Sequence, residues 1–356
     1  MAALVALAGC GGPAGAPSPS EKSSTSESAG AAHGDSGGTL IVYTNSNGEG
    51  RGEWLTKKAA EAGFTIQIVG VGGADATNKL IAEKNNPIAD VVFGLNNMYF
   101  EQLKTAGAIE PYTPSWAGQV DGGLGDKGDG KAYWPLIKQA ILLGYNTDKF
   151  TAESAPKDWT DLWTKDEFKD RYERVTGLGT ATSQLVLAGI LSRYKDDSGD
   201  LGVSADGWHQ IEEYFKHGSP AVAKTDLFAR IAGGEVDMGQ MPSSIIPERE
   251  KSFKVNVDVV KPSVGVPFAV EQVGLVKGTE KKEQAQKFID WFGGAELQGE
   301  WAQQFSSMPV NKGAIEKAKP EVVEFISGLK QQDIDWNFVQ EHIGAWVEKI
   351  ELEYMT

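Results

Sequence analysis

Thr39-Leu40-Ile41-Val42-Tyr43 is the stretch that decides the fold. It is a short, continuous apolar run, which is typical of a buried parallel strand covered on both faces. The polar sequence Thr-Asn-Ser-Asn-Gly at 44–48 follows as a turn, and residues 53–62 have the pattern of an amphipathic helix. Strand, polar turn and helix in this order form the repeating unit of a parallel α/β sheet.

The same unit recurs along the next fifty residues. The predicted strands and helices are, in order, 64–69, 74–85, 89–94 and 99–106. Ligands bind beyond the carboxyl ends of the strands in such sheets. The polar turns after Tyr43, Val69 and Phe93 are therefore natural ligand positions.

Two long extended stretches flank the middle of the chain. Residues 133–145 and 264–276 are apolar and extended, and the block between them is mainly helical. The last third returns to helices with a regular apolar face. This arrangement predicts two α/β lobes, each a mainly parallel sheet flanked by helices, which are joined by two crossings of the chain.

Composition and charge exclude several classes of protein. The chain has 356 residues with a net charge of −15, and its calculated pI is near 4.8. Nucleic-acid phosphates need clustered Lys and Arg, so no nucleic-acid partner is expected. The same acidity disfavours a broad electrostatic contact with anionic lipid. It does not exclude a small anionic ligand, because a few local donors override the net charge.

Cys10 is the single cysteine, which excludes an intrachain disulfide and a multi-cysteine metal site. The sequence Leu7-Ala8-Gly9-Cys10 resembles a bacterial lipobox, in which the cysteine becomes the lipidated first residue of the mature protein. Residues 1–10 are interpreted as a truncated signal segment, because nine uncharged residues are short for one; we expect the natural start to lie upstream. The alternative is that Cys10 is an unmodified thiol without a function.

Residues 11–38 contain almost no large apolar side chain. Such a segment cannot bury enough surface to offset its ordering entropy, so a flexible tether is predicted. No later stretch approaches the ~20 apolar residues that a spanning helix requires. The sequence thus predicts a protein held at the membrane through its lipid.

Seven short motifs resemble those of ABC-importer solute-binding proteins, both periplasmic and lipid-anchored. They are 40–44 (LIVYT), 86–92 (NPIADVV), 142–146 (LLGYN), 229–235 (ARIAGGE), 273–278 (VGLVKG), 285–292 (AQKFIDWF) and 308–310 (MPV). Each motif is weak alone, but all seven occur in the family's order over about residues 39–312. The resemblance implies two lobes that close on a ligand like a hinged clam. It places residues 39–138 plus 270–356 in the first lobe and 139–269 in the second.

Within this family the chain resembles the branch that binds ferric iron, 2-aminoethylphosphonate, sugar phosphates and thiamine. The iron-binding members hold the metal with two consecutive tyrosines in the second lobe, where this chain has Met-Pro-Ser-Ser-Ile at 241–245. Asn47 stands where a helpful histidine commonly lies. Ferric iron prefers anionic oxygen ligands. We therefore expect no metal and no cofactor.

The first lobe offers five candidate ligand residues in its turns. Thr44, Asn45, Ser46 and Asn47 lie between the first strand and the first helix. Their side chains and the N–H groups of the helix are suited to an anion, although plain N-capping explains the same residues. Gly73 would let backbone amides approach a ligand closely, or simply form a turn.

The second lobe offers two clusters of hydroxyl groups. Thr180, Thr182 and Ser183 open a helix after a Gly-rich turn, which suits an anion or a helix cap. Ser243 and Ser244 occupy the position that contacts the ligand in the second lobe of the family. Both clusters are candidate ligand contacts.

Three further candidates lie after the third strand and at the two predicted crossings. Asn96 follows the third strand. Trp134 stands at the first crossing, where an aromatic ring packs either on a ligand or in the hinge. The resemblance implies that Glu271, at the second crossing, points into the cleft, where it is the counter-ion of an amine or else part of a hinge salt bridge.

Motifs for catalysis are weak. Residues 125–131 match the pattern G-x-x-x-x-G-K, but Ala132 replaces the hydroxyl residue that binds Mg²⁺, and Asp126 and Asp129 would repel phosphate. The four histidines form no H-E-x-x-H pair, and no G-x-S-x-G sequence occurs. We predict that the chain is not an enzyme and that 125–131 is an exposed loop.

The sequence therefore predicts a monomeric solute-binding lipoprotein outside the cell membrane that delivers a small polar solute to an ABC permease. An organophosphorus or zwitterionic compound is the favoured solute. Ferric iron, thiamine and polyamines are the alternatives within the fold, and the last two would favour stacking on Trp134. An extracellular hydrolase and an adhesin are the alternatives of another class.

Overall fold

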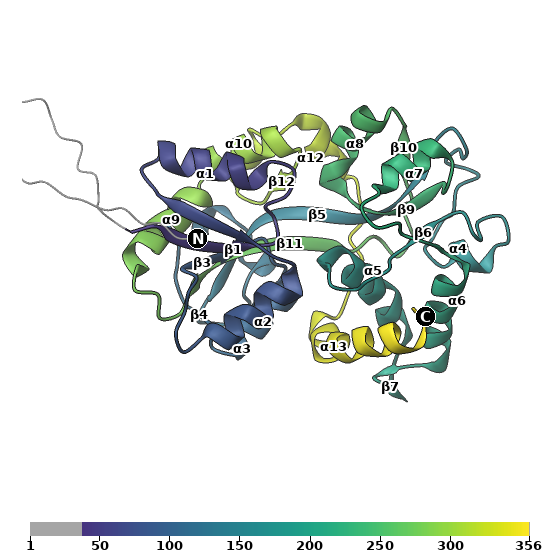
Figure 1. Cartoon of the computed structure of the whole chain (residues 1–356), viewed down its shortest axis with the longest axis horizontal. Helices are drawn as coiled ribbons and strands as arrows, with labels where there is room; N and C mark the ends of the chain where they lie inside the picture. Colours follow the sequence, from purple (N-terminus) through teal and green to yellow (C-terminus); the bar gives the residue numbers. More distant parts are fainter. Residues whose placement is uncertain (1–37, 356) are drawn as a thin grey trace, which may run out of the picture. The chain divides into compact units, whose positions relative to one another are not determined.

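The structure is a computed structural model that describes residues 38–355, and it consists of two α/β lobes (Figure 1). Cys10 and the rest of 1–37 lie outside the described residues. The first lobe begins with β1 (Leu40–Thr44), α1 (Arg51–Glu61), β2 (Ile66–Gly70), α2 (Gly73–Glu83), β3 (Val91–Phe93), α3 (Asn97–Thr105), β4 (Ile109–Glu110) and the short 3₁₀ turns η1 (Ala117–Gln119) and η2 (Gly122–Leu124).

The second lobe contains the middle of the chain between two long strands. β5 (Tyr133–Asn146) leads into it and β11 (Phe268–Val276) leads out of it. Between them lie α4 (Asp161–Thr164), β6 (Glu173–Arg174), α5 (Ala181–Leu191), η3 (Ser192–Tyr194), β7 (Lys195–Asp200), α6 (Ala205–His217), β8 (Ser219–Pro220), α7 (Leu227–Gly233), β9 (Met238–Pro242), η4 (Ser243–Ile245), α8 (Ile246–Phe253) and β10 (Val257–Val259).

The last third of the chain is helical apart from one short strand. Its elements are α9 (Lys282–Phe292), α10 (Ala295–Phe305), β12 (Met308–Pro309), α11 (Lys312–Ile315), α12 (Pro320–Ser327) and α13 (Trp336–Glu353). Helices α9 and α10 pack on the first lobe, where their aromatic residues join the core beneath β1.

The strand β1 shows why an uninterrupted apolar run makes a central strand. It pairs in parallel with β2 on one side and β3 on the other. Because successive side chains point to opposite faces, Leu40 and Val42 enter the core under α1, α9 and α10. Tyr43 enters the opposite core, beside α2 and α3. Both faces are covered, which explains the lack of polar alternation.

The two long strands form the hinge and link the lobes in one sheet. The order β10-β5-β11-β3-β1-β2 runs through both lobes, and β9 also pairs with β5. In the first lobe β1, β2 and β3 are parallel, and β11 is the reversed strand beside β3. In the second lobe β9 and β10 each pair antiparallel with β5. The pairing of β5 with β11 shifts register between Glu271 and Gln272. Figure 1 shows both strands passing between the lobes.

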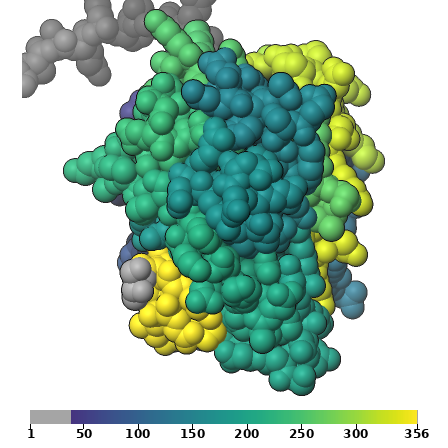
Figure 2. Space-filling view, turned by 90° about the vertical axis from the view of Figure 1, so that its right-hand side faces the viewer, coloured from purple at the N-terminus to yellow at the C-terminus, as the bar shows by residue number. Residues whose placement is uncertain are grey.

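Helix α13 packs on both lobes, whereas the predicted division of the chain placed it in the first lobe. Its apolar residues join a core that it shares with α3 of the first lobe and α5 of the second. Trp346 Nε1 donates to the carbonyl of Leu201 (3.0 Å), and the ring of Tyr354 stacks on Trp208. Figure 2 shows the yellow C-terminal residues against the teal residues of the second lobe. Helix α13 therefore contacts both lobes. The predicted lobe boundaries stay a prediction.

Candidate ligand-binding cleft

A cavity of about 230 Å³ lies between the lobes, and we call it the cleft cavity. Its walls come from the first lobe, the hinge strands and the second lobe. They are Asn45, Ser46, Gly48, Glu49, Arg51, Gly94 and Asn96; then Gln139, Ile141, Ala269 and Glu271; then Ala181, Thr182, Leu185, Pro242, Ser244 and Ile245. Six of the predicted ligand residues meet here: Asn45, Ser46, Asn96, Thr182, Ser244 and Glu271.

The turn after β1 is shaped by Thr44 and by a glycine on the neighbouring strand. Thr44 is fully buried, and its Oγ1 accepts a hydrogen bond from the N–H of Ser46 (2.9 Å). Gly94 has a φ of +90°, and a Cβ there would lie 2.8 Å from Asn45 Oδ1 and 2.9 Å from Ser46 Cβ. The Thr44 hydroxyl therefore stabilises the turn through its hydrogen bond to Ser46, and the missing side chain of Gly94 lets the turn pack closely beside the end of β3.

Two other first-lobe candidates serve packing and do not line the cleft cavity. The side chain of Asn47 lies over Gly70, where a Cβ would be 2.0 Å from its Nδ2. Gly73 lies under the ring of Tyr99, where a Cβ would be 2.6 Å from the ring edge. In this structure Asn47, Gly73 and Thr44 position the turns and do not line the cleft cavity, so a ligand contact at these three residues stays a prediction.

The second lobe presents the first turn of α5 to the cavity. Thr180 is the N-cap, and its Oγ1 accepts from the N–H of Ser183 (3.2 Å), while Ser183 Oγ donates to the Thr180 carbonyl (2.9 Å). Thr180 and Ser183 therefore cap the helix, which is the second of the two roles predicted for them. Ala181 and Thr182 line the cavity, and the first N–H groups of a helix have no acceptor within it. These N–H groups and the helix dipole favour an anionic group.

Glu271 accepts hydrogen bonds from the first lobe and the hinge, and the second lobe joins this network through Gln139. Ser46 Oγ donates to Glu271 Oε2 (2.8 Å), and Gln139 Nε2 donates to Oε1. Gln139 Oε1 in turn accepts from Ser244 Oγ (2.9 Å). Ser243 lies outside this network: its Oγ accepts from the N–H of Ala140 (3.2 Å), and it lines a separate groove beside α8 and α12.

The charge of Glu271 is only partly compensated. The residue is 6% exposed, and burial raises the pKa of its carboxyl group. The Ser46 hydroxyl, the Arg51 charge and the Gln139 amide act in the opposite direction without cancelling the effect. A cationic group in the cavity would supply the missing compensation.

Arg51 and Glu49 form the polar mouth of the cleft cavity. Arg51 Nη1 lies 2.6 Å from Glu49 Oε2 in the first lobe. Glu49 Oε1 also lies 3.1 Å from Arg249 Nη2 of α8, so this ion pair joins the two lobes. Arg51 is thus the one guanidinium on the wall of the cavity among the described residues, facing the carboxylates of Glu49 and Glu271.

Two buried polar atoms on the cavity wall have no hydrogen-bond partner within residues 38–355. They are Asn45 Oδ1, an acceptor, and Asn96 Nδ2, a donor. Asn96 uses its own Oδ1 to cap α3 by accepting from the N–H of Tyr99 (3.3 Å). Because unpaired buried polar groups are costly, both atoms are suited to contacts with a polar solute.

Trp134 packs in the core and does not contact the cavity. Its Nε1 donates to the Tyr112 carbonyl (2.6 Å), and its ring packs edge-on against Trp116. Packing, the second of the two predicted roles, therefore describes Trp134 in this structure. Sequence reasoning also missed Glu49, Arg51 and Gln139. Arg51 opens α1 directly after the polar turn, which is a signal that could have identified it.

The cleft shows no group of metal ligands. Across residues 38–355, no three His, Cys, Asp or Glu side chains lie close enough together to hold a metal ion. The two carboxylates of the cleft cavity, Glu49 and Glu271, both have protein partners. In the same part of the chain, none of the helices combines the length and the apolar character that a membrane span needs.

Comparison with solved structures shows the same two-lobed fold. A ferric binding protein from Campylobacter jejuni superposes with a TM-score of 0.73 at 18% identity, covering 88% of this chain and 99% of that one. The periplasmic binding protein AfuA from Actinobacillus pleuropneumoniae, with fructose-6-phosphate bound, gives 0.72 at 18% identity, covering 89% and 98%.

Sequence comparison shows the family. Residues 53–324 match the model of the bacterial extracellular solute-binding proteins. A probable ABC transporter periplasmic-binding protein of Sinorhizobium fredii, y4fP, is 33% identical over 88% of this chain and 86% of its own length. A putative 2-aminoethylphosphonate-binding periplasmic protein of Salmonella typhimurium is 22% identical over 81% and 82%. The chain therefore belongs to the bacterial extracellular solute-binding proteins that serve ABC transporters.

Proposed function

We propose that this protein captures a small zwitterionic solute, an amine that carries a phosphonate or a comparable anionic group. The observation that carries the proposal is Glu271, a buried carboxylate on the cavity wall whose hydrogen-bond donors are neutral. An ammonium group beside it would complete its compensation. Arg51 and the first turn of α5 are the matching positions for the anionic group.

Size and kinship support the same class of solute. A cavity of about 230 Å³ lies below the ~300–1,000 Å³ of sites for drug-sized ligands, which favours a small metabolite. One relative is described as a putative 2-aminoethylphosphonate-binding protein, and that compound has both required groups. The protein then acts without catalysis: a solute held between the lobes stabilises the closed form, which is presented to a permease.

Thermal melting against a panel of solutes tests this proposal. The panel contains 2-aminoethylphosphonate, ethylphosphonate, ethylamine, β-alanine, fructose-6-phosphate, putrescine, thiamine and ferric citrate. At about a hundred times its Kd, the true solute should raise the free energy of unfolding by roughly 2.7 kcal/mol. We expect 2-aminoethylphosphonate to give this shift and ethylphosphonate, which lacks the amine, to give little.

The control is Glu296→Gln, which removes a carboxylate whose side chain is 85% exposed and outside the cleft. This variant should keep the response that Glu271→Gln loses. An equal response to ethylphosphonate and 2-aminoethylphosphonate would refute recognition of the amine. A response to putrescine alone would show a cationic solute, and a response to ferric citrate alone would overturn the argument against iron.

We also propose that the mature protein is a monomeric lipoprotein anchored through Cys10 at the outer face of the membrane. The support is the lipobox-like sequence before the single cysteine. The test is partitioning of the expressed full chain into a detergent phase. Wild-type protein should enter the detergent phase and Cys10→Ser should stay in the aqueous phase; equal partitioning of the two would refute lipidation.

A further inference from the structure

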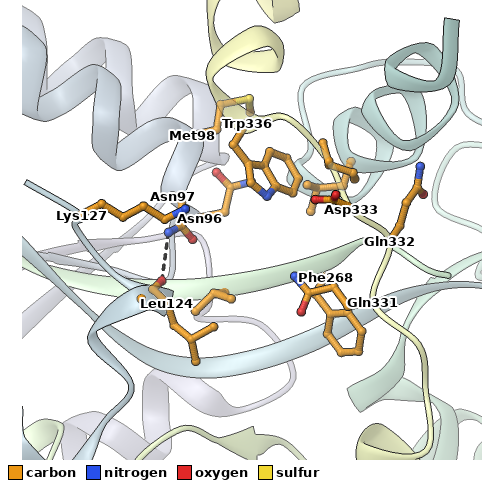
Figure 3. A pocket seen from close by; sticks show the side chains of 14 residues that line it. Asn96, Asn97, Met98, Leu124, Lys127, Phe268, Gln331, Gln332, Asp333 and Trp336 are labelled. Atoms are coloured by element: carbon orange, nitrogen blue, oxygen red, sulfur yellow. Dashed lines mark hydrogen bonds between the residues drawn. The ribbon is translucent and has the colours of Figure 1, made fainter. Parts of the chain in front are cut away.

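A second cavity of about 210 Å³ adjoins the cleft cavity (Figure 3). Its walls come from the start of α3, the loop around η2, strand β11 and the segment that leads into α13. They include Asn97, Lys127, Phe268, Gln331, Asp333 and Trp336. We call it the second cavity. It is polar at its rim, where Lys127, Gln331 and Asp333 are exposed.

The two cavities meet at two residues and at one strand. Asn96 and Leu185 are the described residues that line both. Along β11, Ala269 and Glu271 line the cleft cavity, while Phe268 lines the second. This alternation follows from the strand, whose successive side chains point to opposite faces. Asn96 from the first lobe and Leu185 from the second thus form a shared wall, the Asn96–Leu185 wall.

One hydrogen bond between the lobes and one within each lobe hold this wall in place. Tyr99 Oη, one turn after Asn96, donates to Gln184 Oε1, next to Leu185 (2.7 Å). The N–H of Tyr99 donates to Asn96 Oδ1, and Gln184 Nε2 donates to the Leu178 carbonyl (2.8 Å). Tyr99 and Gln184 are both buried. The wall is therefore fixed on both sides in this structure, and Asn96 Nδ2 has no hydrogen-bond partner within residues 38–355.

We infer that the Asn96–Leu185 wall sets the maximum length of the solute. This inference rests on the proposed zwitterionic solute and deepens it. An amine at Glu271 leaves the rest of the solute within the cleft cavity, and each added methylene would press against the wall or force the lobes apart. Widening the wall would connect the cleft cavity to the second cavity, whose rim is polar enough for the displaced anionic group.

The test is calorimetric titration of two homologous series, the ω-aminoalkylphosphonates and the α,ω-diamines, each from two to five carbons. In the wild-type protein, each methylene beyond the preferred length should weaken binding by roughly tenfold or more. Leu185→Ala should remove this penalty and move the preference to longer members. Asn96→Ser should do the same from the first lobe, because serine can still cap α3.

The matched control is Leu187→Ala, the same change two residues along α5 at a buried position that lines neither cavity. It should lower the melting temperature like Leu185→Ala and leave the preference for length unchanged. An identical ranking of lengths in the wild type, Leu185→Ala and Asn96→Ser would overturn the inference. If diamines bind and aminophosphonates do not, the proposed solute is wrong, and the diamine ranking still decides whether the wall limits length.

Discussion

Two buried carboxylates, Asp126 in the first lobe and Glu271 in the hinge, have opposite electrostatic environments. Burial by itself would raise the pKa of both. At Asp126 the Lys104 ammonium (2.8 Å) and the N–H groups of Ala132 and Gly128 outweigh burial, so its pKa is lowered. At Glu271 the donors do not outweigh burial, and its pKa is raised.

The charge of Asp126 is fully compensated by donors within the protein, whereas the charge of Glu271 is only partly compensated. Asp126 has a cation and two backbone donors, and it organises the loop 125–131, which has the outline of a phosphate-binding loop in the sequence. Glu271 has two neutral donors and faces a cavity. Burial alone therefore does not identify a ligand site. The informative feature is which donor is missing.

The largest expected effect is on affinity. Glu271→Gln should weaken binding of 2-aminoethylphosphonate by roughly 100-fold, because a charge-assisted hydrogen bond contributes about 1.5–3 kcal/mol and each 1.4 kcal/mol is a factor of ten. Asp126→Asn should change the affinity less than threefold. Isothermal titration calorimetry measures both. Equal losses in the two variants would show that Glu271 has no special role.

The second effect is on stability. Asp126→Asn should lower the free energy of unfolding by about 2 kcal/mol at pH 7, since charge-assisted hydrogen bonds are lost. The pKa of Asp126 is lowered on folding, so this stabilisation is present above the pKa of the unfolded carboxyl and is lost as pH falls through the lowered folded value. Urea denaturation between pH 7 and pH 3 should show the difference between wild type and variant shrinking toward acid.

The same experiment on Glu271→Gln should give the opposite pattern. The pKa of Glu271 is raised on folding, so its contribution is most favourable below the unfolded pKa and is lost as pH rises through the folded value. Without solute, the variant should be at least as stable as wild type at pH 7. If Glu271→Gln lowered the free energy of unfolding as much as Asp126→Asn does, the charge of Glu271 would also be fully compensated by the protein.

A third effect is the pH dependence of solute binding. An amine requires the charged carboxylate, so affinity should fall by up to about tenfold per pH unit as pH drops through the raised pKa of Glu271. Calorimetry from pH 8 to pH 5 gives the slope. Glu271→Gln serves as the reference because it keeps any titration of the solute itself. If the affinity of the wild type and of Glu271→Gln depends on pH in the same way, Glu271 is not the titrating group.

The smallest effect concerns the ion pair at the mouth of the cleft. Glu49 and Arg249 are each about a quarter exposed, and pairs of this kind contribute about 0.2–1 kcal/mol. Arg249→Ala should weaken solute binding by no more than about fivefold at low salt, and 0.5 M salt should abolish the difference. A large, salt-independent loss would place this pair among the buried contacts.

Much of the fold could be predicted because it depends on local patterns. The strand at 39–43 appears as Leu40–Thr44 and the helix at 74–85 as Gly73–Glu83, shifts of one or two residues. Helix α13 shows the limit of such patterns. Its stripe of Val339, Ile343 and Trp346 identifies a buried face. The stripe does not say which lobe supplies the partner, because that depends on the path of the chain after α11.

The site was predictable at the level of turns and less so at the level of residues. A serine or threonine that caps a helix looks in sequence like one that binds a solute, and only the structure shows that Thr180 and Ser183 use their hydroxyl groups on each other and on the backbone. Gln139 carried no sequence signal, because its role depends on the register that sets β5 beside β11.

The irregular register between Glu271 and Gln272 has a consequence for the order of events in capture. Glu271 lies on the hinge strand β11 beside this irregularity, so we expect it to move less than residues at the edges of the two lobes when the lobes rotate. Asn45 and Thr182 belong to opposite lobes, so their separation changes most. We therefore expect a solute to dock by its amine on an almost stationary carboxylate before its other end is enclosed. We therefore expect capture of the proposed zwitterionic solute to show two kinetic phases, a collision and a slower enclosure.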